Sequence, residues 1–196
     1  MGQEKFLISL NPGRDLPFIP GQGCFYSWSL QLRDESGNKF SIYCSQKFGA
    51  IDKEVQKLSS KFDNIIIDAG GRDSKELRTA TLVADKLYIP VQSSQFDIWS
   101  ISGMERIVSK AVDLNPNLDA YIIINRASTN PSVQETREAQ ELIQELEFIR
   151  LGNVVIKERI AFRKAAREGM SVIELKGGDK KANEEIMALY KEVYNG

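Results

Sequence analysis

The residues best placed to do chemistry are polar or turn-forming residues that end apolar runs. Asp68 ends the run in FDNIIIDAGG, Pro90 follows KLYI, and Asn125 and Arg126 follow AYIII. If these runs are parallel strands, their carboxyl ends meet at one edge, where ligands bind in α/β sheets. Side-chain oxygens suit hard cations such as magnesium, so the pattern predicts a ligand-binding edge with Asp68 as its metal ligand.

Each of these residues also has a purely structural interpretation, because any strand must end in something polar. Asp68 could accept backbone N–H bonds and cap the Gly-Gly-Arg turn that follows it. Asn125 could be a turn residue, and Arg126 could be a surface cation. The residues alone leave both interpretations open.

Composition excludes several kinds of site. The 196-residue chain has no histidine, and its two cysteines, Cys24 and Cys44, do not form a C-x-x-C pair. This excludes Ser-His-Asp and Cys-His catalysis as well as histidine or thiolate metal sites. The net charge of −1 means that any contact with nucleic acid must come from a local patch. One basic cluster is present, and its members are Lys157, Arg159, Arg163, Lys164 and Arg167.

Strand-like and helix-like segments alternate along the chain, which predicts an α/β fold with a mostly parallel sheet and helices on both faces. We expect one domain over residues 1–196, with an atypical Gly/Pro-rich segment over 1–45. The expected strands are 40–44, 64–68, 86–91, 120–125 and 153–156, with a short apolar run at 5–10 and a short extended piece at 172–175. The expected helices are 50–60, 74–84, 98–112, 130–147, 161–168 and 181–194, with Ser74 as a cap, Pro131 in a first turn and Gly169 as a stop.

Three stretches carry a resemblance to a known family. They are FDNIIIDAGGRDSKELRTATLVADKLYIPVQSSQFDIWS at 62–100, YIIINRAS at 121–128 and IKERIAFRKAAREGMSVIEL at 156–175. Their order and spacing resemble the ParA/MinD-type deviant Walker P-loop ATPases, especially the short ParA proteins of plasmid partition. The resemblance covers roughly residues 50–194 and implies a P-loop NTPase-like fold.

The resemblance also implies a function, namely plasmid or chromosome segregation or positioning, with ATP and magnesium. A cytoplasmic location is expected on other grounds, because no apolar run approaches about 18 residues and MGQEKFLISLNPG lacks the pattern of a signal peptide. The resemblance implies that Asp68 contacts the metal and that Pro90, Asn125 and Arg126 lie beside the nucleotide. It further implies that the basic cluster at 157–167 binds DNA phosphates without sequence preference. A solvated helix face explains the same cluster. The implied partners are a centromere-binding protein and a second copy of the chain, with no membrane.

The N-terminal part departs from the family, because no G-K-[ST] occurs in the sequence. A P-loop needs that lysine and its glycines to hold the β- and γ-phosphates. The stretch SLNPGRDLPFIPGQG starts like the strand before a P-loop, or alternatively places residues 9–12 where the family has D-x-D-P. Either the chain is a degenerate homologue, or its N-terminal third has been replaced or lost.

We therefore do not expect ATP hydrolysis by the chain as written, although the resemblance implies an ATPase. The alternative function is a non-catalytic interaction module that keeps the fold but not the nucleotide site.

Overall fold

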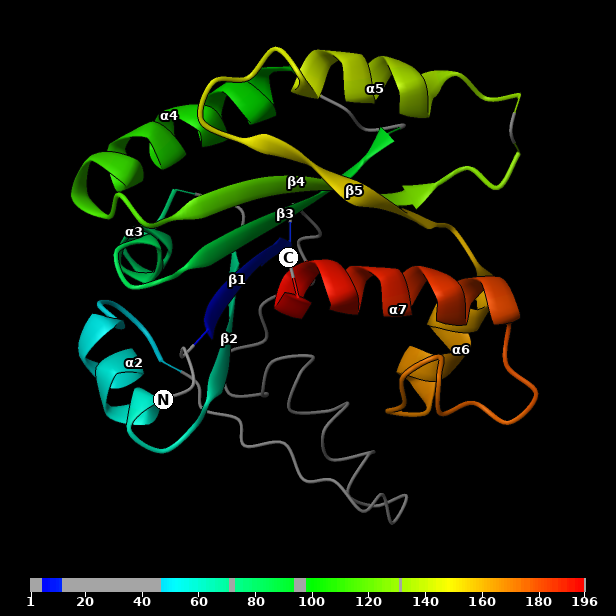
Figure 1. Ribbon diagram of the computed structural model, residues 1–196, viewed down its shortest axis with the longest axis horizontal. Coiled ribbons are helices and arrows are strands. Elements are labelled where there is room, and N and C mark those ends of the chain that lie inside the picture. The colour runs from blue at the N-terminus through cyan, green and yellow to red at the C-terminus, as the bar shows by residue number, and fades with distance from the viewer. Residues whose placement is uncertain (1–4, 12–46, 71–72, 94–97, 131, 196) are drawn as a thin grey trace.

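The computed structural model describes residues 5–11, 47–70, 73–93, 98–130 and 132–195. They form a five-stranded sheet in which every neighbouring pair is parallel, with the strand order β2-β1-β3-β4-β5 (Figure 1). The strands are β1 (Lys5–Asn11), β2 (Asn64–Gly70), β3 (Lys86–Gln92), β4 (Asp119–Ala127) and β5 (Arg150–Lys157).

The parallel sheet confirms the predicted fold class, with one correction to the strand order. We expected segments 64–68, 86–91 and 120–125 to be direct neighbours. β3 and β4 do pair, but β1 lies between β2 and β3 and pairs with both. The predicted strand at 40–44 and the Gly/Pro-rich segment up to residue 46 lie outside the described residues.

Helices cover both faces of the sheet. The described helices are α2 (Asp52–Ser59), α3 (Lys75–Thr81), α4 (Ile98–Leu114), α5 (Glu135–Ile143), α6 (Ile160–Arg167) and α7 (Lys180–Asn195). The main core joins Val55, Leu77, Val108 and Ile143 of α2 to α5 with alternate strand residues such as Ile122. The residues between them, Tyr88 and Ile123, pack with Val193 of α7 on the opposite face.

Helix α7 forms hydrogen bonds with two strands of the sheet, β3 and β5. Near its C-terminal end, Lys86 Nζ donates to the carbonyl of Val193 at 2.9 Å. On the other side, Glu192 accepts from the backbone N–H of Asn153 and Glu185 accepts from that of Lys157, each at 3.1 Å. These carboxylates occupy N–H groups that the edge strand β5 would otherwise offer to another strand.

Two expected elements differ from the structure. The helix predicted over 130–147 is confined to α5, because Asn130 forms a turn in which its carbonyl accepts from Val133 N and its side chain from Ser132 N. Pro131 lies outside the described residues. The extended piece predicted at 172–175 is wrong: it is a turn in which Glu174 N donates to the carbonyl of Ser171. Val172 is buried there against Ala165 and Ala182, and no strand of the described residues pairs with this turn.

The caps follow the sequence signals. Ser74 accepts from the backbone N–H of Leu77 and so caps α3, and Gly169 takes a φ of +65° just after α6. No helix in the described ranges has both the length and the apolar character to cross a bilayer.

Candidate functional site

The carboxyl ends of the strands form the edge on which the predicted site residues fall. In the sheet register, Asp68 is level with Ser9 of β1, and Ser9 is level with Tyr88 of β3. Pro90 lies two residues further along β3, opposite Ile123. Asn125 of β4 lies two residues further towards the carboxyl end than Ile123, opposite Gln92 of β3. The structure therefore brings Asp68, Pro90 and Asn125 to one edge, at successive heights.

The surroundings of Asp68 bear on its two predicted roles, metal ligand and turn cap. Its side chain forms no hydrogen bond or ion pair with a described residue, and it lies on the same exposed face of β2 as Ile66. Although its residue is exposed, neighbouring atoms partly desolvate the carboxyl and raise its pKa above the ordinary value. A carboxylate that is partly desolvated and has no partner among the described residues could accept a cation.

Arg126 is held by a carboxylate that the sequence analysis did not pair with it. Its Nε and Nη2 donate to the two oxygens of Glu158 at 2.8 and 3.0 Å. This hydrogen bonding raises the pKa of Arg126 above its ordinary value. Arg126 also has a left-handed backbone, with a φ of +56°. Glu158 follows β5 directly, so its place at the end of the neighbouring strand was a usable signal.

The separation across the sheet limits what Asp68 and Asn125 could bind together. They lie on β2 and β4, three strand positions apart, which corresponds to roughly 14 Å across the sheet. A single small group cannot contact both, whereas an extended ligand could. Among the residues described, no three acidic or cysteine side chains gather into a metal cage. Magnesium commonly needs only one or two protein carboxylates when substrate phosphates supply further oxygens, so Asp68 fits that role.

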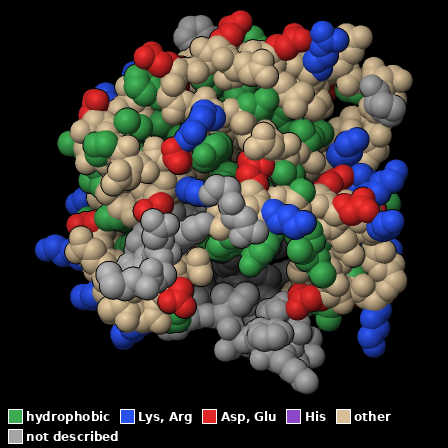
Figure 2. Space-filling model, in the orientation of Figure 1, with side chains coloured by type: hydrophobic (Ala, Val, Ile, Leu, Met, Phe, Trp, Pro, Cys, Tyr) green, Lys and Arg blue, Asp and Glu red, His purple; other side chains and the backbone are tan. Residues whose placement is uncertain are grey.

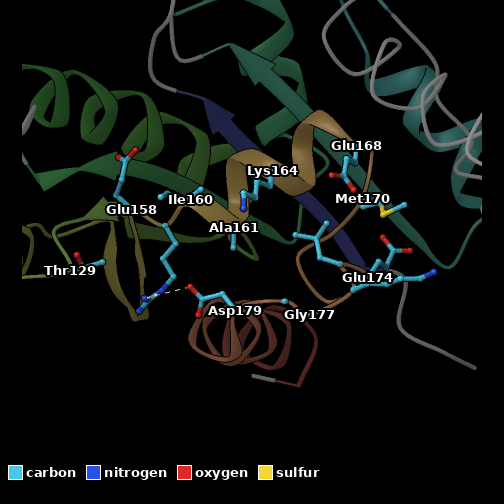
Figure 3. A pocket seen from close by; sticks show the side chains of 14 residues that line it. Thr129, Glu158, Ile160, Ala161, Lys164, Glu168, Met170, Glu174, Gly177 and Asp179 are labelled. Atoms are coloured by element: carbon cyan, nitrogen blue, oxygen red, sulfur yellow. Dashed lines mark ion pairs between the residues drawn. The ribbon is translucent and has the colours of Figure 1, made fainter.

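A cleft of about 930 Å³ lies beside the ends of β4 and β5. Thr129 and Glu158 line it from the sheet side, α6 forms one wall, and the turn before α7 forms the other (Figure 3). Arg159 spans its base, with its guanidinium 2.6 Å from Glu185 and 3.9 Å from Asp179. The sequence analysis did not predict this cleft, because residues 172–175, which include part of its second wall, were expected to be extended.

The basic cluster divides into two parts. Arg159 is 13% exposed in its side chain and is committed to Glu185, while Lys157 is half-buried at the end of β5. Arg163, Lys164 and Arg167 are exposed on α6. Figure 2 shows Lys and Arg side chains gathered on the right of the view, over the end of the molecule that carries α6 and the start of α7, with acidic side chains among them.

Comparisons with known proteins agree with this architecture. A family profile described as ATPase MipZ matches residues 27–115. The maintenance of carboxysome distribution protein A of Halothiobacillus neapolitanus is 30% identical over 109 residues, which are 56% of this chain. The chain spans about half, 49%, of that protein's length.

Solved structures share the fold at low identity. The apo structure of McdA from Cyanothece superposes with a TM-score of 0.60 at 16% identity, covering 96% of this chain and 87% of McdA. An ATP complex of a McdA variant from Cyanothece gives 0.54 at 20%, covering 95% and 85%. A ParA family ATPase from Chlorobium tepidum gives 0.54 at 14%, covering 98% and 86%.

The α/β, P-loop NTPase-like fold is therefore confirmed, as is the resemblance to the ParA/MinD-type ATPases. The individual roles of Asp68, Pro90, Asn125, Arg126 and the basic cluster stay predictions.

Proposed function

We propose that this chain is a ParA-like positioning or partition protein that binds ATP-magnesium at the carboxyl edge of its sheet and non-specific DNA through α6. One observation carries the proposal: β1 lies between β2 and β3, so the chain leaves β1 at the topological switch point of a 2-1-3-4-5 sheet. Ligands of such sheets bind at that crevice. Asp68 lies on the strand beside it.

The described residues have distinct roles in this proposal. Asp68 holds the magnesium ion, which when bound neutralises charge on the phosphates. Pro90 and Asn125 lie at the ends of β3 and β4, where the base and ribose would rest. Arg126 is oriented by Glu158 through Nε and Nη2, which leaves Nη1 outside that pair for a ligand.

The missing G-K-[ST] limits the affinity. Without its lysine and amides, we expect ATP-magnesium to bind no tighter than about millimolar, or about 4 kcal/mol. Hydrolysis is not part of the proposal, because phosphoryl transfer depends on that charge neutralisation. The central position of β1 favours placing SLNPG where the family has the strand before its P-loop, rather than at D-x-D-P.

The DNA part of the proposal rests on α6. Arg163, Lys164 and Arg167 lie within one and a third turns of the helix and are exposed. Such a group contacts phosphates without reading sequence, and each neutralised phosphate steepens the salt dependence by roughly 0.9 log units.

The test is a gel-shift series with a short random-sequence duplex at several salt concentrations. The double variant Arg163→Glu/Arg167→Glu should weaken binding at least about tenfold and flatten the salt slope, because it reverses two phosphate contacts. Lys53→Glu/Lys75→Glu, which reverses two exposed lysines on α2 and α3, is the matched control. Equal binding by both double variants would remove α6 from the proposal. If the unchanged protein binds no DNA at low salt, the non-catalytic interaction module becomes the better function.

A further inference from the structure

The cleft beside α6 has two walls of different character. Ile160, Lys164 and Glu168 recur every four residues on α6 and therefore share the helix face that lines it. Arg163 and Arg167 do not line the cleft, although Arg163 Nη1 lies 3.9 Å from the lining carboxylate of Glu158. The opposite wall is the turn that carries Leu175 and Gly177, and Figure 3 shows Gly177 and Asp179 across from Ala161.

Most carboxylates of the cleft are already engaged. Glu158 holds Arg126, and Glu174 accepts from the backbone N–H of Ser171. Asp179 accepts from Lys181 N and Ala182 N at the start of α7 and also lies near Arg159. Each of these acidic groups is therefore partly neutralised or hydrogen-bonded within the protein.

The lysines of the cleft are not engaged in this way. Lys164 and Lys176 are exposed and form no ion pair with any residue in the described part of the chain. Glu168 is the one remaining lining carboxylate without a described partner. The cleft thus offers two cations against one anion, which favours a ligand that carries negative charge.

The cleft also has an apolar component that phosphates would not use. Ile160 is 62% exposed at its margin, and Met170 and Leu175 are half-buried in its lining. Just outside it, Ile173 is 48% exposed on the same turn. Apolar side chains grouped in a concave surface and rimmed by charge are typical of sites that receive an anchor residue of a partner protein.

We propose that this cleft docks a short acidic and apolar segment of a partner protein. An apolar side chain of that segment packs between Ile160, Met170 and Leu175, and its carboxylates pair with Lys164 and Lys176. Duplex DNA fits this surface less well, because its phosphates would not pack favourably against the apolar lining. The proposal is independent of the nucleotide edge and of Arg163 and Arg167.

Peptide display against the full chain tests the proposal, with a random library of about twelve residues as the probe. We expect enrichment of net-negative peptides with a Leu, Ile or Phe anchor. For a synthetic copy of an enriched peptide, fluorescence anisotropy should show at least about tenfold weaker binding to Lys164→Glu/Lys176→Glu, and a severalfold loss with Ile160→Gln.

Matched controls separate the cleft from general surface effects. Lys191→Glu reverses an exposed lysine on α7, and Leu114→Gln replaces a side chain that is 74% exposed at the end of α4; neither should change peptide binding. Recovery of no peptide, or of net-positive peptides, would overturn the proposal, as would equal binding to the Lys164→Glu/Lys176→Glu variant. Displacement of the peptide by a short duplex from wild type and from Arg163→Glu/Arg167→Glu alike would reassign the cleft to nucleic acid.

Discussion

At the scale of single residues, the carboxyl edge contains two residues, Asp68 and Arg126, whose conformation or surroundings reduce the stability of the fold. The Asp68 carboxyl is partly desolvated and has no partner among the described residues. Arg126 has a left-handed backbone conformation, which is unfavourable for residues other than glycine. Such costs are retained where a residue has a task other than stability.

Asp68→Asn should stabilise the protein at neutral pH. The folded-state pKa of Asp68 is raised, so its contribution to the free energy of unfolding is most favourable below the unfolded-state pKa and falls as pH rises through the folded-state value. The variant lacks this decline, so its advantage in thermal midpoint over wild type should be larger at pH 7 than at pH 3.

The control for Asp68→Asn is Asp63→Asn, an exposed position just before the same strand. Asp63→Asn should change the thermal midpoint by the same amount at pH 7 as at pH 3. A loss of about 1 kcal/mol at pH 7 in Asp68→Ala that is absent in Asp68→Asn would instead identify Asp68 as a turn cap, because asparagine also accepts backbone N–H bonds.

Replacing Arg126 by glycine and by alanine separates its backbone from its ion pair. Both changes remove the contact with Glu158, but only glycine takes the observed φ of +56° without steric cost. In urea unfolding, we expect the glycine variant to be more stable than the alanine variant by about 1 kcal/mol. Equal stabilities would mean that the left-handed conformation is not maintained once the ion pair is lost.

At the scale of elements, the sequence predicted most of the sheet and helices from their periodicity. The runs NIIID, KLYIPV and AYIII each form a strand. KLYIPV and AYIII lie in the interior of the sheet and are apolar on both faces, whereas β2 is an edge strand with Ile66 57% exposed. The position of β1 could not be predicted in this way, since strand order depends on how the chain crosses the sheet rather than on local pattern.

The same contrast holds for the candidate site. Asp68, Pro90 and Asn125 could be placed at one edge because they end predicted strands. The pairing of Arg126 with Glu158 and the cleft beside α6 depend on contacts between residues over 30 positions apart or on a turn with no local signal. Residues 172–175 were expected to be extended because Val and Ile favour strands, yet none of the five described strands pairs with them.

Helix α7 is held against the end of β5 by Glu185. Glu185→Ala would leave Arg159, whose side chain is 13% exposed, and the backbone N–H of Lys157 without their acceptor. Chemical unfolding should show a loss of about 2 kcal/mol, because removing Glu185 leaves the largely buried Arg159 with only the longer 3.9 Å contact to Asp179.

Glu184→Ala is the matched control for that change. Glu184 is the adjacent residue on α7, and its side chain is 62% exposed and 3.8 Å from Lys180. Its removal should cost no more than about 0.5 kcal/mol. Similar losses in both variants would show that the Glu185 contacts do not hold α7 to β5.

At the scale of the whole molecule, three surfaces lie at or near the carboxyl ends of the strands. They are the proposed nucleotide edge at β1 to β4, the exposed cations of α6, and the cleft between α6 and the turn before α7. The surfaces share two side chains, because Lys164 lies both on α6 and in the cleft, and Glu158 lines the cleft while it holds Arg126. Arg163 and Arg167 do not line the cleft and Lys176 is not on α6, so variants at these positions test the proposed DNA and peptide surfaces separately.

The most direct test of the central claim is a titration of the full chain with ATP-magnesium, followed by NMR of backbone amides. We expect saturable shifts with an affinity of about millimolar, centred on Gly70, Gln92, Asn125 and Arg126, and a severalfold weaker affinity in Asp68→Asn. Micromolar affinity would show that another loop cradles the phosphates, and Gly21-Gln22-Gly23, outside the described residues, is the segment to examine. No saturable shift at these amides up to about ten millimolar would contradict a nucleotide site at the carboxyl edge.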